Sequence, residues 1–321
     1  MADPTFEQLS QQIQAHFTAG AYAEGLSLAD RHAPQFSAAH PVLDYWRACL
    51  AARLDQPERV VAILDTALSQ GTWYGQALLR DSPSLESMQG LPEFERLVDI
   101  SRQMQLKDPA ESMPMLVVRP ESECRSPEHP CPLLLFLHSN TDTAAANLEF
   151  WGVAPRQGWL LALPQSSRAM WAGAYSWNDH ESAAEDIIPL YDKLTSQYAL
   201  DPGRTILAGF SMGAEVALWL ALSGRIPAQG FILLGPGGPF MDTIERWAPL
   251  IKDSQDSGLR GAFITGLADT TIPHDNVRAL VTALNAAGIP THHEEHIDLA
   301  HEYPPNFDER LLHALDHITN T

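Results

Sequence analysis

The sequence predicts two folded parts: an all-α N-terminal domain, and a C-terminal α/β domain with a mostly parallel sheet covered by helices. Three observations support this prediction. Apolar residues recur with a helical period up to about residue 106. From residue 115 onward, short apolar segments alternate with longer helical patterns. The chain has 321 residues, enough for about two domains. We therefore expect domains at 1–106 and 115–321, joined by a linker at 107–114.

The first domain is predicted from helical spacing. Leu9, Ile13 and Phe17 recur every four residues, and Gly20 follows that helix. Further helices are expected at 22–32, 42–54, 57–68 and finally up to about 105. The pair 42–54 and 57–68 resembles a tetratricopeptide helix pair, and a weak self-similarity at an offset of 35 residues is near the 34-residue period of that family. Fewer than three clean repeats are visible, so a generic helical-hairpin domain is the alternative.

The second domain alternates strands and helices. Continuous apolar segments such as Leu133–Leu137 are typical of strands covered on both faces. In parallel sheets of this kind the functional site lies beyond the carboxyl ends of the strands. We expect strands at 115–118, 133–137, 159–163, 205–208, 231–234, 262–265 and 292–297, and helices at 144–155, 183–198, 214–222, 277–287 and 307–318.

One motif stands between a predicted strand and a predicted helix: Gly209-Phe210-Ser211-Met212-Gly213. A G-x-S-x-G sequence in this context is typical of a nucleophile elbow, a tight turn that lifts a serine hydroxyl clear of the sheet. The glycines leave room where side chains would collide. The turn also places Ser211 at a helix N-terminus, where the Met212 amide faces a developing oxyanion. The alternative, without a catalytic role, is a small-residue turn before a buried helix.

An activated serine needs a base and an acid that orients the base. Asp269 follows the strand predicted at 262–265, and His301 follows the strand predicted at 292–297. Their order after Ser211 is the order of elbow-type hydrolases. We therefore predict a catalytic triad of Ser211, Asp269 and His301. Asp298 is the rival acid, and the rival histidines lie within a predicted strand at positions 292, 293 and 296.

On these motifs, residues 115–318 resemble the α/β-hydrolase superfamily, close to its phospholipase/carboxylesterase and dienelactone-hydrolase-like branch. The matching segments are Leu137–Asn140, Gly209–Gly213, Gly266–Asp269 and His301–Pro304. The resemblance implies an α/β-hydrolase fold and an oxyanion hole made by the amides of Met212 and Asn140. Family members usually have His-Gly where this chain has His138-Ser139. Ser139 is therefore the alternative second donor, and His138 is expected to be structural.

The loop 164–180 carries the aromatic residues Trp171, Tyr175 and Trp177 after a strand end. We predict that these side chains line an apolar acyl or aromatic substrate pocket beside Ser211. The alternative is that they anchor the loop to the domain.

The charge composition argues against some classes of binding partner. Forty acidic residues face 20 basic ones, for a formal net charge of −20, which argues against nucleic acid and anionic membranes. The three cysteines do not suggest a disulfide framework; Cys124 and Cys131 could bridge across a Pro-containing turn, but free thiols are the preferred prediction. No signal peptide, membrane span, metal site or cofactor is expected, and the predicted location is the cytoplasm.

The sequence thus predicts a serine hydrolase of small-molecule carboxylic esters that acts through an acyl-enzyme. A thioesterase, a peptidase or an acyltransferase would share the same chemistry and differ in the pocket. An alternative of another class is a non-catalytic interaction protein. In either case the helical domain is a candidate surface for a protein partner or for self-association.

Overall fold

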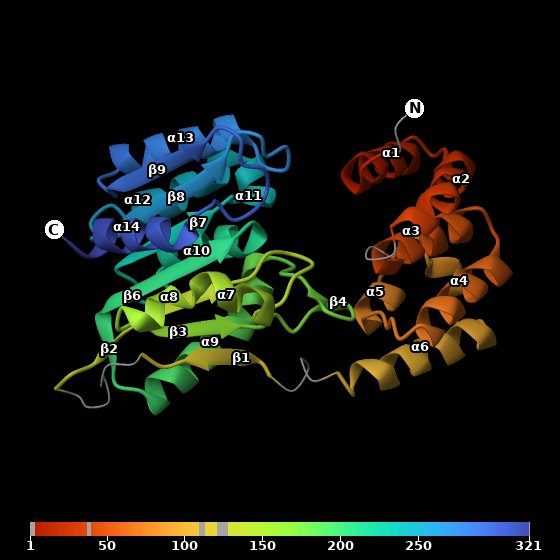
Figure 1. Cartoon of the computed structure of the whole chain (residues 1–321), viewed down its shortest axis with the longest axis horizontal. Helices are drawn as coiled ribbons and strands as arrows, with labels where there is room; N and C mark the ends of the chain where they lie inside the picture. The colour runs from red at the N-terminus through yellow and green to blue at the C-terminus, as the bar shows by residue number, and fades with distance from the viewer. Residues whose placement is uncertain (1–3, 37–39, 109–112, 121–127, 321) are drawn as a thin grey trace. The chain divides into compact units, whose positions relative to one another are not determined.

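The computed structural model describes residues 4–36, 40–108, 113–120 and 128–320 (Figure 1). The chain divides into two compact units, which we describe separately. The helical unit comprises Met1–Ser112 together with Arg168–Ala174, and the second unit comprises Met113–Ser167 and Tyr175–Thr321. The predicted linker at 107–114 includes residues 109–112, which lie outside the described residues.

The helical unit is built from helices of which most pack on their chain neighbours, while the fourth packs on the third and the sixth. Apolar side chains spaced by three and four residues put a single buried stripe on each main helix, as in α4, where Val60, Ile63, Leu64 and Ala67 are buried. Thr5 forms a capping box with Gln8 at the first helix. The helices are α1 (Phe6–Thr18), α2 (Tyr22–His32), α3 (His40–Arg53), α4 (Pro57–Ser69), α5 (Gln76–Arg80) and α6 (Pro92–Gln105). The helical N-terminal prediction is confirmed, and a tetratricopeptide-like character stays a prediction.

The second unit contains a seven-stranded sheet in the order β1-β3-β2-β6-β7-β8-β9. Strand β1 pairs antiparallel with β3 at one edge, and the other neighbours are parallel. The predicted mostly parallel sheet is therefore confirmed. The strands are β1 (Met115–Val118), β2 (Cys131–Leu137), β3 (Leu160–Pro164), β6 (Leu200–Phe210), β7 (Gly230–Leu234), β8 (Arg260–Gly266) and β9 (Thr291–His296).

Helices cover both faces of this sheet because its strands are apolar on both faces. Along β2, Leu133, Leu135 and Leu137 belong to one buried cluster, and Leu134 and Phe136 belong to the other. The first cluster is closed by α9 (His180–Gln197), α10 (Met212–Leu222), α12 (Ala248–Asp253) and α13 (His274–Ala286), and the second by α7 (Leu148–Trp151), α8 (Val153–Arg156) and α14 (Phe307–Thr319).

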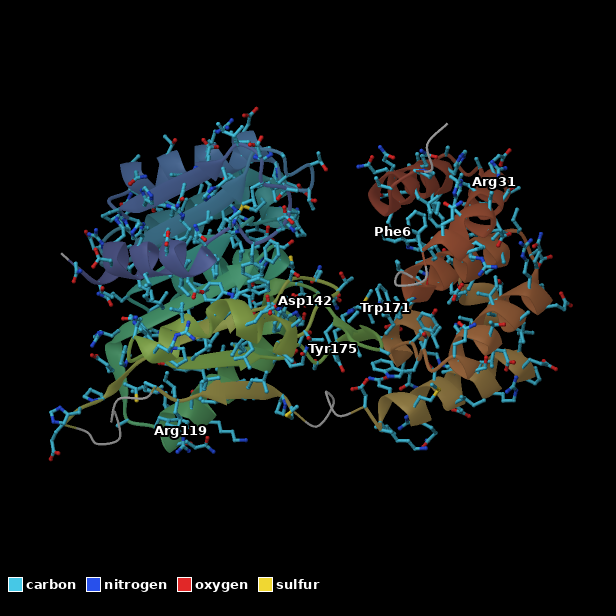
Figure 2. The ribbon with its side chains drawn as sticks, viewed as in Figure 1. Phe6, Arg31, Arg119, Asp142, Trp171 and Tyr175 are labelled. Carbon is cyan, nitrogen blue, oxygen red and sulfur yellow. The ribbon has the colours of Figure 1, made fainter. Side chains whose placement is uncertain are left out.

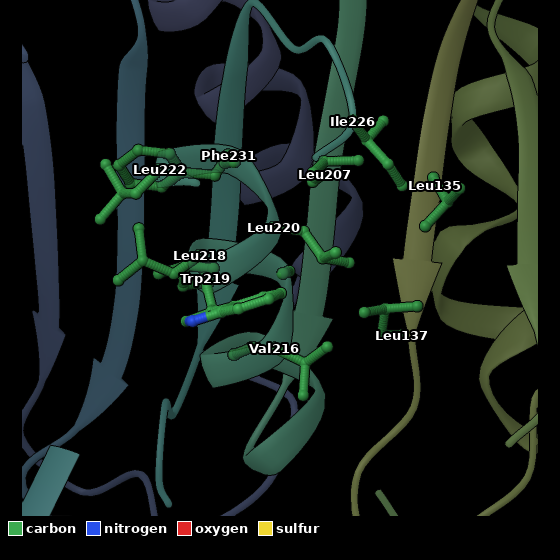
Figure 3. Packing of buried hydrophobic residues seen from close by; sticks show 14 of the residues in the cluster. Leu135, Leu137, Leu207, Val216, Leu218, Trp219, Leu220, Leu222, Ile226 and Phe231 are labelled. Carbon is green, nitrogen blue, oxygen red and sulfur yellow. The ribbon is translucent and has the colours of Figure 1, made fainter. Parts of the chain in front are cut away.

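Helix α10 is buried on every side, which explains why its sequence is apolar throughout. Figure 3 shows side chains of this helix, among them Val216, Leu218 and Leu220, packed against residues of the neighbouring strands. The helix begins directly after Ser211. A rigid, fully packed helix therefore fixes the position of the serine.

Two predictions need correction. The helix expected at 144–155 is divided into three short pieces, a 3-10 turn (Ala145–Asn147) followed by α7 and α8, with the break at Gly152. Cys131 is disulfide-bonded, so the prediction of a free thiol is wrong there. Cys124 lies outside the described residues, and Cys49 is a buried free thiol. Disulfides are typical of oxidising compartments, so the disulfide at Cys131 does not support the predicted cytoplasmic location. That location stays a prediction.

Candidate active site

The turn between β6 and α10 holds Ser211 in an unusual backbone conformation, with φ 54° and ψ −121°. The turn is tight because the flanking glycines allow it. A Cβ added at Gly209 would lie 2.3 Å from the carbonyl group of Gly213, and one added at Gly213 would lie 2.3 Å from the carbonyl oxygens of Leu137 and His138. Only glycine fits at either position. The structure therefore contains the sharp strand–turn–helix that the motif predicts.

His301 and Asp269 meet beyond the ends of β9 and β8. The His301 Nδ1 lies 2.6 Å from Asp269 Oδ2, and the Thr271 amide donates to Asp269 Oδ1 at 2.7 Å. Burial alone would raise the pKa of the Asp269 carboxyl, but its hydrogen bonds with His301 and Thr271 outweigh that effect and lower the pKa. The acid therefore stays ionised and holds the Nδ1–H tautomer of His301.

His301 and Ser211 lie on the same edge of the sheet. The ring of Phe210, the residue before the serine, contacts the His301 ring at a centroid distance of 4.8 Å. A Cβ added at Gly235 would lie 3.4 Å from His301 Nδ1, and one added at Gly237 would lie 4.0 Å from Ser211 Oγ. The glycine segment after β7 therefore runs past both side chains. That Ser211 and His301 act together as nucleophile and base stays a prediction.

Two of the three rival histidines have other partners in the structure. Asp298 is exposed. His293 Nε2 lies 2.8 Å from Thr265 Oγ1, and His296 Nε2 lies 3.1 Å from the Glu294 carboxylate.

The predicted oxyanion donors belong to α10 and to the loop after β2. Met212 is the first residue of α10, and amides of a first helical turn lack acceptors within the helix. Asn140 is exposed, and its side-chain oxygen accepts from the Trp177 amide at 2.8 Å. Ser139 is half-buried, with its hydroxyl donating to Asp142 at 3.1 Å. The choice between the two amides stays a prediction.

His138 fixes the start of this oxyanion loop, residues 138–144. Its buried ring lies between two groups: Nδ1 donates to the Ser139 carbonyl at 2.7 Å, and Nε2 accepts from the Ser166 amide at 3.2 Å. Burial lowers the pKa of His138 to about 4, so the ring is neutral at neutral pH. With Nδ1 donating and Nε2 accepting, the ring must be the neutral Nδ1–H tautomer.

The three aromatic residues predicted to line a pocket are not placed alike. Tyr175 and Trp177 are buried in the second unit, and Trp177 Nε1 donates to the His138 carbonyl at 2.8 Å. Trp171 is half-buried and belongs to the helical unit. These contacts are those of anchoring residues, and a role in binding substrate stays a prediction for all three.

Sequence reasoning missed the partners of Glu215. This buried carboxylate on α10 accepts from the amides of Phe240 and Met241 at 2.8–3.1 Å. A Cβ added at Gly238 would lie 2.6 Å from the same carboxylate. Glu215 thereby fixes the segment that follows Gly237. The glycine-rich sequence 235–238 was the available signal.

The described ranges contain no cluster of three or more His, Cys, Asp or Glu side chains suited to a metal ion. None of the helices in those ranges is both long and apolar enough to cross a membrane.

Comparison with known proteins identifies the fold. Residues 5–108 match a family described as "A/B hydrolase-like, N-terminal domain". The second unit contains a mostly parallel sheet, a strained serine elbow and a His-Asp pair at the strand ends. The second unit has the α/β-hydrolase fold. We call it the hydrolase unit from here on.

Solved structures agree with this fold. A crystal structure of an uncharacterized protein from Bacillus cereus is 24% identical, with 99% of both chains covered and a TM-score of 0.56. A ferulic acid esterase is 16% identical, covering 64% of this chain and 91% of its own, with a TM-score of 0.51. Both likenesses extend to the fold only. The search of curated proteins returned no match to this sequence.

Proposed function

We propose that the protein is a serine hydrolase that cleaves carboxylic esters through an acyl-enzyme. The observation that carries the proposal is the His301–Asp269 pair, 2.6 Å apart, on the same sheet edge as Ser211 in its strained elbow. A serine at such a turn is exposed to substrate, and a histidine held by a buried carboxylate is a suitable base.

The reaction begins when Ser211 Oγ attacks the ester carbonyl carbon while His301 Nε2 takes the hydroxyl proton. The amides of Met212 and Asn140 bind the oxyanion of the tetrahedral intermediate. His301 then returns its proton to the departing alcohol, and an acyl-serine ester remains. Water attacks this ester with His301 as base, and the carboxylic acid leaves. Asp269 stabilises the imidazolium in both halves without taking its proton.

A glycine and an apolar side chain lie beside the nucleophile. Gly237 has no side chain, and a Cβ there would lie 3.6 Å from Ile272 and 4.0 Å from Ser211 Oγ. Apolar and aromatic acyl groups are therefore the first substrates to try, including the aromatic esters suggested by the name of the ferulic acid esterase neighbour. Tyr175, Trp177 and Trp171 stay candidates for the remaining wall.

The test is hydrolysis of short p-nitrophenyl esters by the purified protein and by Ser211→Ala. We expect the variant to lose activity and to keep its circular dichroism spectrum. Activity that survives the substitution would rule out the assignment. Matched ester, thioester and amide substrates with one acyl group then separate an esterase from a thioesterase or a peptidase.

The oxyanion donors have a separate test, because a backbone donor is removed only by proline. We expect Asn140→Pro to cost ~10²–10³ in kcat, the loss typical of one oxyanion donor. Asn140→Ala keeps the amide and should cost less. If a folded Asn140→Pro protein keeps full activity, Ser139 is the next donor to test.

A further inference from the structure

We propose that Tyr303 is a positioning residue that ties the loop carrying His301 to the oxyanion loop through the side chains of Asn147 and Asp142. We call these three side chains the Tyr303 network. Tyr303 lies two positions after His301, and the whole network belongs to the hydrolase unit. The catalytic consequence rests on the function proposed above. The structural consequence, that the Tyr303 hydroxyl holds residues 138–144, can be tested without it.

The network is a row of hydrogen bonds that begins at an indole and ends at a carboxylate. The Trp151 indole donates to the Tyr303 hydroxyl at 2.9 Å, and this hydroxyl donates to Asn147 Oδ1 at 2.5 Å. Asn147 Nδ2 then donates to Asp142 Oδ2 at 2.8 Å. The Ser139 hydroxyl donates to the same carboxylate oxygen at 3.1 Å. The Asp142 carboxylate therefore joins the network to the start of the oxyanion loop.

The two ends of the network fix the direction of its bonds. An indole N–H can only donate and a carboxylate can only accept. The Tyr303 hydroxyl must therefore donate onward to Asn147, whose buried amide has its oxygen toward Tyr303 and its nitrogen toward Asp142. A flipped amide would place its oxygen against the carboxylate. Burial raises the pKa of the Tyr303 hydroxyl well above its ordinary value, so the proton that it donates is retained.

The ring of Tyr303 is held by aromatic packing next to the candidate triad. It stacks on Phe150 at a centroid distance of 3.8 Å and contacts the edge of Phe307 at 4.9 Å. A third contact, at 5.3 Å, is with Phe210, whose ring also contacts His301 at 4.8 Å. Phe210 is the residue before the proposed nucleophile. The Tyr303 hydroxyl therefore projects from a fixed ring toward Asn147.

The oxyanion loop has a conformation that needs outside support. Thr141 has φ 60°, a value that a β-branched residue rarely adopts, and it directly follows Asn140, the proposed second oxyanion donor. The Tyr175 amide donates to the Asp142 carbonyl at 3.1 Å, and the Asp142 amide donates back at 3.3 Å (Figure 2). These bonds fix the Asp142 backbone, and the Tyr303 network fixes its carboxylate. Misplacing a catalytic group by about 1 Å can cost ~10²-fold in rate.

The experiment compares Tyr303→Phe with the wild-type full-length protein, because this substitution keeps the ring and removes only the hydroxyl. Two sets of quantities are measured: amide hydrogen exchange of peptides covering 138–144, and kcat and KM on a p-nitrophenyl ester. We expect exchange faster by about 5- to 100-fold, as for the loss of one buried hydrogen bond. We expect a kcat lower by about 10- to 100-fold with KM changed by less than about threefold, because an oxyanion donor acts in the transition state.

The exchange measurement has an internal reference and a matched control. Peptides of α10 should stay protected over the times at which 138–144 exchanges, which distinguishes local opening from unfolding of the whole unit. The control is Tyr191→Phe, which removes a tyrosine hydroxyl from the same unit. Tyr191 is half-buried on α9 and packs against the cluster on the other face of the sheet. It should leave exchange at 138–144, kcat and KM unchanged.

A second variant breaks the middle of the network. Asn147→Ala leaves the Tyr303 hydroxyl bonded to Trp151, and it should shift the same quantities in the same direction even if Tyr303→Phe does not fold. The double variant should lose no more kcat than the larger single variant, because both substitutions interrupt one row of bonds and residues in one network are not additive.

Three results would overturn the inference. Unchanged exchange at 138–144 in Tyr303→Phe would mean that the hydroxyl does not hold the loop. Faster exchange with unchanged kcat would mean that the network does not position a catalytic group. Additive losses in the double variant would mean that the two side chains act separately. If the wild-type protein hydrolyses no ester, the proposed function fails, and the exchange measurement still decides the structural claim.

Discussion

The backbone of Ser211 should store measurable strain. Its φ of 54° with ψ −121° lies in a region that non-glycine residues rarely adopt, and such conformations cost about 1–3 kcal/mol. Ser211→Ala removes the hydroxyl and keeps the strain, whereas Ser211→Gly removes both. Glycine also raises the entropy of the unfolded chain, which costs about 0.5–1 kcal/mol. We therefore expect the glycine variant to be more stable than the alanine variant by about 1 kcal/mol, within a span of about 0–2.5 kcal/mol.

The assay is urea unfolding of both variants, followed by the fluorescence of the buried tryptophans. A difference of about 1 kcal/mol corresponds to roughly 2–4 °C in Tm for a domain of 150–250 residues. Because both variants lack the hydroxyl and both should be inactive, their difference isolates the backbone term. Ser223, at the other end of α10, is the control, since its φ of −77° is relaxed. There the glycine variant should be the less stable one.

The reasoning fails if Ser211→Gly is no more stable than Ser211→Ala. That result would mean that the elbow is relaxed at this residue. The turn would then be an ordinary helix start, and the strain would no longer support a nucleophile.

Three further predictions concern the residues around the serine. Asp269→Asn should lower kcat by ~10⁴ on an ester, as in a comparable triad, while the exposed Asp298→Asn should stay within about twofold; the opposite outcome would mean that the acid is misassigned. The pKa of His138 is about 4 in the folded protein and about 6.5 when unfolded, so the unfolded state binds more protons between these values. The free energy of unfolding, measured with urea, should therefore fall by about 3 kcal/mol as the pH drops from above 6.5 to 4. In His138→Gln it should fall by less over the same pH range. Tyr303→Phe should cost about 1–3 kcal/mol in unfolding free energy, because the Trp151 indole and the Asn147 side chain each lose a buried partner; a neutral result would show that water replaces the hydroxyl.

The fold was predictable because it depends on local patterns. Each buried strand of the parallel sheet is a short apolar run, and the helices carry a stripe of apolar residues. The candidate triad was also accessible, since Ser211, Asp269 and His301 each follow a strand and the carboxyl ends of parallel strands share one edge. Gly209 and Gly213 could be assigned their steric role for the same local reason.

The rest depends on contacts between distant residues, which no local pattern encodes. Gly75 gives no sign in the sequence that it faces Ala169, because the clash that a Cβ would make lies across 94 positions of chain. The same holds for Glu215, whose position at the start of α10 suggests a favourable helix dipole but not the amides of Phe240 and Met241 that it holds. The sequence allows a bridge at Cys131, but free thiols were the preferred prediction because spacing alone does not fix pairing.

The loops beyond the strand ends are joined mainly by backbone bonds, which explains how separate segments keep one geometry. The Ser211 amide donates to the Leu234 carbonyl, and the Gly237 amide donates to the Ser211 carbonyl, which joins the elbow to the loop after β7. The Ala268 amide donates to the Leu299 carbonyl, which joins the loops that carry Asp269 and His301.

Gly266 shows how close these loops must be. A Cβ at this position would lie 2.1 Å from the Leu299 carbonyl oxygen, so a side chain there would separate the loop of the acid from the loop of the base. Gly209 and Gly213 likewise leave room for the main chain that packs against the elbow. The geometry of the candidate site is therefore set by where side chains are missing as much as by the three residues that would perform the chemistry.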